Sequence, residues 1–284
     1  MSRINTNKIK FLVKIRVIRG SKGLRTQYQF VSLKVKFFRK VEVYKTMLKP
    51  TDFFDLTSFE HAELFANLEY VWEGLHNLNA YLGQIFETQQ RSIEGDVAPS
   101  AKLIGDNIVI GPGTVVEEAA CIFGPTYIGR NCHIRHGAYI RGQVIMGDGC
   151  TLGHASEIKH SIMLNDAGAP HFSYVGDSIL GARVNLGAGT KLSNLTLVSQ
   201  KDSITGKRPT LNITIDGDTF DTRLTKMGAI MGDDSQSGCN AVLNPGCLVG
   251  PRTLIYSNVS LRKGYYPPDS IVKLRQSIEI VTRQ

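Results

Sequence analysis

The chain has 284 residues, five cysteines and a formal net charge of +8. No stretch approaches the roughly 18 continuous apolar residues of a membrane span, and the N-terminus lacks the apolar core of a signal peptide, so we expect a cytoplasmic protein without a membrane span. Residues 1–46 contain thirteen Lys and Arg against one acid, so the other 238 residues carry +8 minus +12, a net charge of −4. The basic charge belongs to one segment and gives no reason to expect nucleic-acid binding by the whole chain.

Residues 1–46 form a basic extension that mixes charged residues with short apolar runs. Leu33, Val35 and Phe37 alternate with polar residues in a brief strand-like pattern, and no helical period is present. Three interpretations stay open. The segment is a tail for nucleic acid or an anionic surface, an edge hairpin, or translated sequence upstream of the true start at Met47.

Residues 47–95 form the next segment, and most of it has a helical pattern. Thr57 and Glu60 have the spacing of a capping box. The apolar stripe that follows has the four-three spacing of one helix face. Because the terminal coil of a solenoid exposes apolar surface and strand edges, we expect this helix to cap the open end of the repeat that follows, with an oligomer contact as the alternative. The stripe consists of Leu64, Leu68, Val71, Leu75, Leu78, Leu82 and Ile85.

Residues 96–267 are dominated by a period of six. A six-residue period fits neither an amphipathic helix nor an isolated strand, but it is typical of a solenoid in which each hexad supplies one short strand and one corner. Three hexads close a triangular coil, so residues eighteen apart should stack roughly 4.8 Å apart. We predict a mainly β protein, a left-handed parallel β-helix of hexapeptide repeats with an N-terminal helical cap. The first aliphatic positions are Ile104, Ile110, Val116, Ile122, Ile128, Ile134, Ile140, Met146, Leu152, Ile158 and Leu164.

The hexads break twice. The first break covers residues 165–173, and the second covers about 199–226, with a predicted hairpin that turns at Asp216-Gly217. Loops that interrupt a repetitive scaffold are where function is usually placed, so we expect the site near residues 165–174 and 193–228. The hexads end near residue 267, which leaves 268–284 as a C-terminal tail.

Two pairs of residues with metal-binding or redox chemistry are eighteen apart and should stack. Cys132 and Cys150 fill tight corner positions, and an odd number of cysteines without a secretion signal favours reduced thiols. His136 and His154 are interpreted as an ordinary polar ladder. No metal is expected, because the five-residue ligand spacing of zinc-binding β-helix proteins is absent.

Two motifs point to one family. The runs are His171-Phe172-Ser173-Tyr174-Val175-Gly176-Asp177 and Asn185-Leu186-Gly187-Ala188-Gly189-Thr190. Over about residues 97–267 the chain resembles the acetyltransferase domain of the bifunctional glucosamine-1-phosphate acetyltransferase/N-acetylglucosamine-1-phosphate uridylyltransferase family. The version in archaeal-type sugar-1-phosphate nucleotidylyltransferases resembles it most, since it also has a longer second insertion.

The resemblance implies a role for nine residues. His171 matches the general base that takes a proton from the sugar amine. Arg141 and Lys159 match the cations that hold the sugar phosphate, and their spacing of eighteen independently predicts that they stack. The positions that contact the sugar are Tyr174 and Asn185. The positions along the acetyl-CoA groove are Ala188, Asn194, Cys239 and Ser257.

The resemblance also has gaps. Leu195 stands where the common bacterial form has an aromatic residue, and Cys239 stands where a serine is usual. Residues 1–95 lack the Gly-rich nucleotide loop and the length of a uridylyltransferase domain, so we expect no nucleotidyl transfer. Glu157 and Lys226 are only candidate contacts.

The sequence therefore predicts an N-acetyltransferase that moves acetyl from acetyl-CoA to the amine of an amino-sugar 1-phosphate, with glucosamine-1-phosphate favoured. The resemblance further implies a homotrimer in which a neighbour completes the groove. The alternative is a non-catalytic solenoid that binds sugar phosphate or serves as a scaffold, which the changes at Leu195 and Cys239 keep open.

Overall fold

The computed structural model describes residues 48–89, 91–197, 199–277 and 280–282, together with the backbone of two short strands near the N-terminus. The chain divides into two units, residues 1–45 and 46–284. In the first unit, β1 (Val13–Arg16) and β2 (Tyr28–Val31) pair antiparallel. The strand-like pattern expected at residues 33–37 lies outside the described residues.

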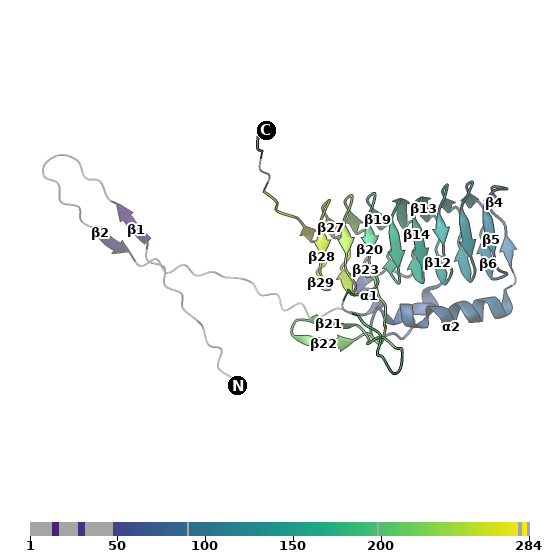
Figure 1. The fold of residues 1–284 in the computed structure, drawn as a ribbon, viewed down its shortest axis with the longest axis horizontal. Helices are drawn as coiled ribbons and strands as arrows, with labels where there is room; N and C mark the ends of the chain where they lie inside the picture. The colour runs from purple at the N-terminus through teal and green to yellow at the C-terminus, as the bar shows by residue number, and fades with distance from the viewer. Residues whose placement is uncertain are drawn as a thin grey trace. The chain divides into compact units, whose positions relative to one another are not determined.

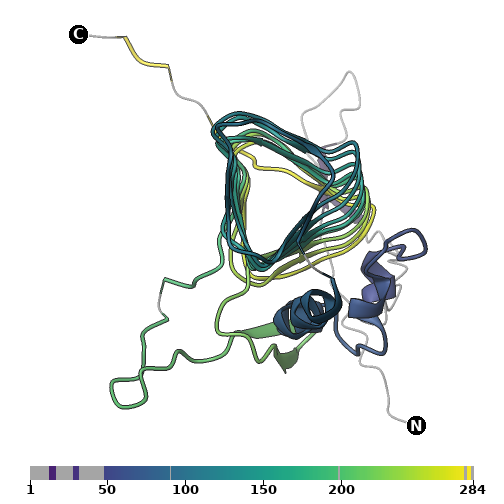
Figure 2. The ribbon, with the colours of Figure 1, turned by 90° about the vertical axis from the view of Figure 1, so that its right-hand side faces the viewer.

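The second unit is a prism with three sheets of parallel strands, which we call faces 1, 2 and 3 (Figures 1 and 2). Face 1 contains β4 (Asp96–Val97), β7 (Val115–Val116), β10 (His133–Ile134), β13 (Thr151–His154), β16 (Gly168–His171), β19 (Asn185–Leu186), β24 (Gln236–Ser237), β27 (Leu254–Ile255) and β30 (Ile271–Val272). Face 2 contains β5 (Lys102–Ile104), β8 (Cys121–Phe123), β11 (Tyr139–Ile140), β14 (Glu157–Lys159), β17 (Tyr174–Gly176), β20 (Lys191–Leu192), β25 (Val242–Leu243) and β28 (Ser260–Leu261). Face 3 contains β3 (Ser92–Ile93), β6 (Ile108–Ile110), β9 (Thr126–Ile128), β12 (Val144–Met146), β15 (Ser161–Met163), β18 (Ile179–Leu180), β23 (Ala229–Met231), β26 (Cys247–Val249) and β29 (Gly264–Tyr266).

The hexads produce this prism because their aliphatic residues fill its interior. Residues eighteen apart pair in register, as Ile122, Ile140 and Ile158 do on face 2. All three side chains are fully buried in one core that runs the length of the prism. The predicted fold class, a left-handed parallel β-helix, is confirmed.

The first expected interruption is absent, and that prediction was wrong. The β-helix continues through residues 165–173, because Thr151 pairs with Gly168 in a coil of seventeen residues. The loss of one residue moves the inward positions to Ala169 and Val175, both fully buried. After such a deletion a strict six-residue spacing no longer coincides with the inward positions, so the sequence pattern looks interrupted where the β-helix continues. His171 therefore ends strand β16 and does not lie in an inserted loop.

The second interruption is a true insertion. It leaves the β-helix after β20 and returns at β23, because Asn185 pairs with Gln236 fifty-one residues later. The predicted hairpin is confirmed: β21 (Asn212–Ile215) and β22 (Asp218–Asp221) pair antiparallel around Asp216 and Gly217. Both turn residues have positive φ, as a two-residue hairpin turn of this kind requires.

The N-terminal helical segment does not cap the open end, so that prediction is corrected. The segment contains α1 (Pro50–Phe53), η1 (Ala62–Phe65) and α2 (Glu73–Thr88). In Figures 1 and 2, α2 runs along the side of the prism beside face 3. Leu75, Leu78 and Leu82 bury themselves against outward side chains of that face, namely Val109, Tyr127, Ile145 and Ile162.

The physical reason is that face 3 is apolar on its outer side as well as its inner side. A helix of sixteen residues is roughly 24 Å long, which matches about five coils of the prism. The long helix also begins later than expected. Thr57 donates to Asp55 in a local turn, so the capping-box spacing at Thr57 does not start a helix.

Candidate functional site

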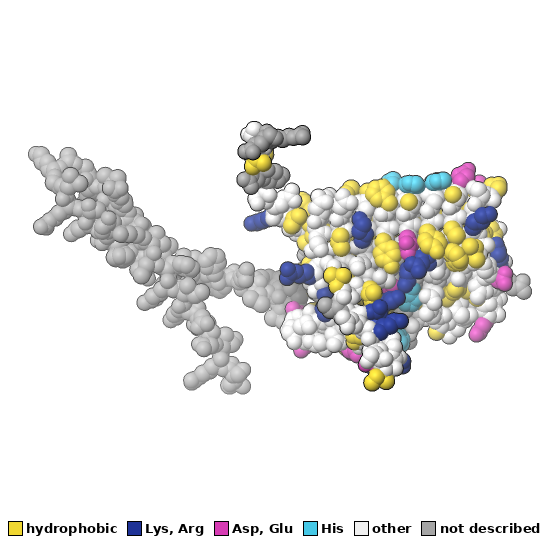
Figure 3. Space-filling model, viewed as in Figure 1, with side chains coloured by type: hydrophobic (Ala, Val, Ile, Leu, Met, Phe, Trp, Pro, Cys, Tyr) yellow, Lys and Arg dark blue, Asp and Glu magenta, His cyan; other side chains and the backbone are white. Residues whose placement is uncertain are grey.

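One edge of the prism carries a continuous ladder of corner residues, which we call the histidine corner. It lies between faces 1 and 2 and contains, in order along the axis, His136, His154, His171, Ala188, Cys239 and Ser257. The carbonyl of each of the first five residues accepts a backbone hydrogen bond from the next coil, for example at 3.1 Å from the Gly189 N–H to His171 and at 2.8 Å from the Asn240 N–H to Ala188. The row of histidines follows one edge in Figure 3.

The imidazole of His171 lies in the middle of this ladder and is exposed. The ring of Phe172, which is 54% exposed, lies 6.3 Å away between centroids. The neighbouring rings of His136 and His154 stack at 5.7 Å. The ladder therefore places three of the four predicted acetyl-CoA positions in line with the predicted base.

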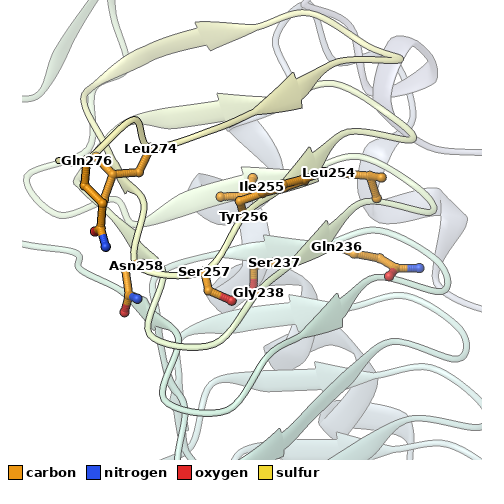
Figure 4. Close-up of a pocket in the computed structure, with 10 residues that line it drawn as sticks. All are labelled: Gln236, Ser237, Gly238, Leu254, Ile255, Tyr256, Ser257, Asn258, Leu274 and Gln276. Carbon is orange, nitrogen blue, oxygen red and sulfur yellow. The ribbon is translucent and has the colours of Figure 1, made fainter. Parts of the chain in front are cut away.

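The ladder leads to a pocket of about 530 Å³ on face 1 (Figure 4). Ser257 and Gly238 line it at the corner, and Leu274 and Gln276 line it from the C-terminal segment. Lys273 lies 5.1 Å from the ring centroid of Tyr256, another lining residue. Three coils separate His171 from Ser257, which is roughly 14 Å along the axis.

The predicted phosphate-binding cations lie on the opposite edge of face 2, which we call the cation corner. Arg141 and Lys159 stack in adjacent coils, as their spacing predicts. Each already has an acidic partner, because Arg141 Nη1 lies 2.7 Å from Glu157 Oε1 and Lys159 Nζ lies 3.2 Å from Asp177 Oδ2. A bound phosphate would share these cations with the two carboxylates.

Asp177 is the centre of the cation corner, and only 5% of the residue is exposed. It also accepts a hydrogen bond from Asn194 Nδ2, and His160 Nδ1 lies 3.0 Å from its other oxygen. Burial acts to raise the pKa of Asp177, but the hydrogen bonds from His160 and Asn194 and the charge of Lys159 outweigh it, so the pKa lies below its ordinary value. The carboxylate is therefore held in its charged form.

Tyr174 lies between the two corners, on β17. A Cβ atom on Gly176 would lie 2.6 Å from the Tyr174 hydroxyl oxygen, so the glycine gives the ring room to lie over the strand. Burial raises the pKa of Tyr174, and the charges of Glu157 and Asp177 raise it further. Its phenol is therefore a neutral hydrogen-bonding group on the open face.

Asn185 and Asn194 lie apart from the other residues predicted to contact the sugar and acetyl-CoA, respectively. Asn185 is exposed on face 1, across the histidine corner from Tyr174. Asn194 lies at the cation corner with Asp177 and not with the three acetyl-CoA positions of the ladder. Met227 donates to the Asn194 carbonyl at 3.1 Å, so Asn194 and Lys226 mark the base of the insertion. Asp177 and His160 were not predicted as site residues, although Asp177 belongs to the first motif.

Some classes of site receive no support from this geometry. Within the described residues, no three His, Cys, Asp or Glu side chains are grouped to hold a metal ion. The five cysteines are free thiols. None of the helices in the described ranges is long and apolar enough to cross a bilayer.

The three-faced β-helix built from six-residue repeats defines a class, the hexapeptide-repeat proteins. Within that class, residues 122–215 match the family described as the GMPPB C-terminal domain. The chain is 34% identical to the bifunctional protein GlmU of Methanococcus maripaludis over 193 residues, which is 68% of this chain and 43% of that protein. It is 32% identical over 87 residues to a bifunctional sugar-1-phosphate nucleotidylyltransferase/acetyltransferase of Sulfurisphaera tokodaii, covering 31% of this chain and 20% of that protein.

These matches confirm the resemblance to the acetyltransferase domain of the bifunctional family. The chain spans less than half the length of these relatives. Among solved structures, the UDP-N-acetylglucosamine acyltransferase of Francisella novicida aligns with 17% identity and a TM-score of 0.41, over 60% of this chain and 62% of that one.

Proposed function

We propose that the chain is an acetyl-CoA-dependent N-acetyltransferase that acts on an amino-sugar phosphate, with glucosamine-1-phosphate as the favoured acceptor. The observation that carries the proposal is the arrangement around face 2. An exposed imidazole lies on one edge and a pair of stacked cations lies on the other, and the edge with the imidazole leads to a pocket. The relatives named as bifunctional nucleotidylyltransferase/acetyltransferases support this choice of reaction.

The sugar lies over face 2 in this proposal, with Tyr174 beneath it and its phosphate at Arg141 and Lys159. Acetyl-CoA follows the ladder of Ala188, Cys239 and Ser257 into the pocket on face 1. The thioester then reaches His171 from one side while the amine reaches it from the other. Holding both reactants at one point supplies much of the rate, since it replaces a bimolecular encounter.

The reaction needs one proton transfer at His171. The amine nitrogen attacks the thioester carbonyl carbon, and the C–N bond forms. His171 Nδ1 or Nε2 takes the proton from the nitrogen, the C–S bond breaks, and CoA leaves as its thiol after accepting a proton. Cys239 lines the groove in this scheme and forms no acyl-enzyme. A homotrimer would bring a second chain to the open side of the ladder.

The test is the rate of CoA release from acetyl-CoA with glucosamine-1-phosphate, for wild type, His171→Asn and His154→Asn. His154 is the matched control because it is an exposed histidine one coil away on the same ladder. We expect His171→Asn to lower kcat about 10²- to 10⁴-fold and His154→Asn to leave it nearly unchanged. Equal rates in the two variants would exclude His171 as the base. A folded wild type that binds the sugar phosphate without turnover would favour the scaffold alternative.

A further inference from the structure

The cation corner continues past Arg141 into an aromatic pair. The position that stacks on Arg141 in the preceding coil is Phe123, and Ile104 stacks on Phe123 in the coil before that. The ring of Tyr139 meets the ring of Phe123 edge to face, with 5.9 Å between centroids. Tyr139 is 39% exposed. Figure 3 shows hydrophobic side chains gathered beside Lys and Arg side chains on the molecule.

A second pocket opens next to this pair. It measures about 250 Å³ and lies at the turns that directly follow Ile104 and Phe123. Its lining residues are Gly105, Asp106, Asn107, Gly124 and Pro125. The side chains of Asp106 and Asn107 are exposed, so they offer a carboxylate and an amide to a bound molecule.

Face 2 and the cation corner at its edge thus carry one line of features across four coils. The line begins at Tyr174, passes the stacked cations Lys159 and Arg141, and ends at the aromatic pair and its pocket. Lys159 and Phe123 are two coils apart, roughly 10 Å along the axis. An amino-sugar 1-phosphate would occupy only the first half of this line.

The geometry points to a nucleotide-linked amino sugar as the acceptor, with its diphosphate on Lys159 and Arg141 and its nucleoside on Phe123, Tyr139 and the pocket at Asp106 and Asn107. This inference rests on the proposed acetyl transfer at the same site, and it replaces the sugar 1-phosphate favoured above by a nucleotide-linked amino sugar as the preferred acceptor. Aromatic side chains are sequence-tolerant stacking platforms for nucleobases. The carboxylate of Asp106 suits the hydroxyl groups of a ribose, and the Asn107 amide suits the edge of a base.

A contact with a second copy of the chain is the main competitor for the aromatic pair. The core of a protein interface is depleted in charged residues. Here the column that contains Tyr139 also contains Glu157 on one side and, two coils away on the other, Lys102. Arg141 stacks on Phe123, one ring of the pair. The charged surroundings fit a phosphorylated ligand better than an interface core.

The test has two parts. UDP and GDP are titrated calorimetrically into wild type, Tyr139→Ala, Phe123→Leu and Val115→Ala, where Val115 is an exposed apolar residue on face 1 and serves as the control. In parallel, kcat/KM is measured with an amino-sugar 1-phosphate and with the matching UDP- and GDP-linked amino sugars. We expect at least one nucleoside diphosphate to bind, Tyr139→Ala to weaken it roughly 5- to 100-fold, and Val115→Ala to leave it unchanged.

Each outcome separates the two proposals. Acetyl transfer to the sugar 1-phosphate without binding of either nucleotide would overturn the inference and leave the proposed function intact. Nucleotide binding that Tyr139→Ala abolishes, without acetyl transfer to any acceptor, would sustain the nucleotide site and overturn the proposed function. Equal nucleotide binding by wild type and Tyr139→Ala would overturn the inference. If Tyr139→Ala changed the oligomeric mass measured by sedimentation and left nucleotide binding unaltered, the inference would also be overturned, because the aromatic pair would then belong to a subunit contact.

Discussion

Faces 2 and 3 are built from the same six-residue repeat pattern, yet the side chains on their outer sides differ. The outward residues of face 3 are aliphatic or aromatic and lie beneath α2. The outward residues of face 2 include Glu157, Tyr174 and Lys191, and no described helix covers them. The inward residues decide the fold, and the outward residues decide which face is covered and which is left for a ligand.

The largest expected effect comes from disrupting the packing of α2 on face 3, the covered face. Leu78→Ala should lower the free energy of unfolding by about 2–5 kcal/mol, because its side chain is fully buried between α2 and face 3. Val115→Ala on an open face should change it by less than about 0.5 kcal/mol. Urea unfolding of both variants measures the difference. Similar losses in the two would show that α2 contributes little to stability.

The next largest effect is expected from disrupting the cation corner at the edge of face 2, the open face. Asp177→Asn removes the carboxylate shared by Lys159, His160 and Asn194, so we expect at least a tenfold loss in kcat/KM and a destabilisation of about 1–3 kcal/mol. The control is Asp234→Asn, which breaks the exposed pair with Arg183 and should cost less than about 1 kcal/mol. If Asp177→Asn changes neither kcat/KM nor stability, Asp177 is not part of the site.

The pH dependence of this carboxylate follows from the direction of its shift. Because the pKa of Asp177 is lower in the folded chain than in the unfolded chain, its stabilisation is present above the ordinary aspartate range of about 4. It is lost as the pH falls through the folded value. Asp177→Asn should therefore flatten the acid limb of the stability curve, and urea midpoints below pH 5 would show it.

The smallest expected effect concerns a histidine that is buried against the outer side of face 3. His61 is 4% exposed, its Nδ1 lies 3.2 Å from the Tyr81 hydroxyl, and within the described residues its Nε2 has no hydrogen-bond partner. Burial lowers its pKa, although the charges of Glu60 and Asp148 oppose the shift. The unfolded chain therefore binds this proton more readily, so stability should fall as the pH drops below about 6.5. His61→Phe should reduce this slope, and His76→Gln, on the exposed side of α2, should leave it unchanged.

The sequence predicted most of the prism, because inward positions repeat with a fixed period. It predicted a helix in the region of α2 but not that this helix packs along face 3. Runs such as Ile108–Ile110 and Val144–Met146 are apolar at inward and outward positions alike, which indicates a covered face. The same spacing predicted that Arg141 and Lys159 stack. It could not place Asn194 beside Asp177, because a seventeen-residue coil intervenes and the insertion starts there.

The most direct test of the account is a crystal structure of the full chain with CoA and glucosamine-1-phosphate bound. We expect the CoA thiol beside the His171 imidazole, the nucleotide end of CoA at the Ser257 pocket, and the sugar phosphate at Arg141 and Lys159. A sugar phosphate bound away from face 2, or a CoA thiol remote from His171, would contradict it.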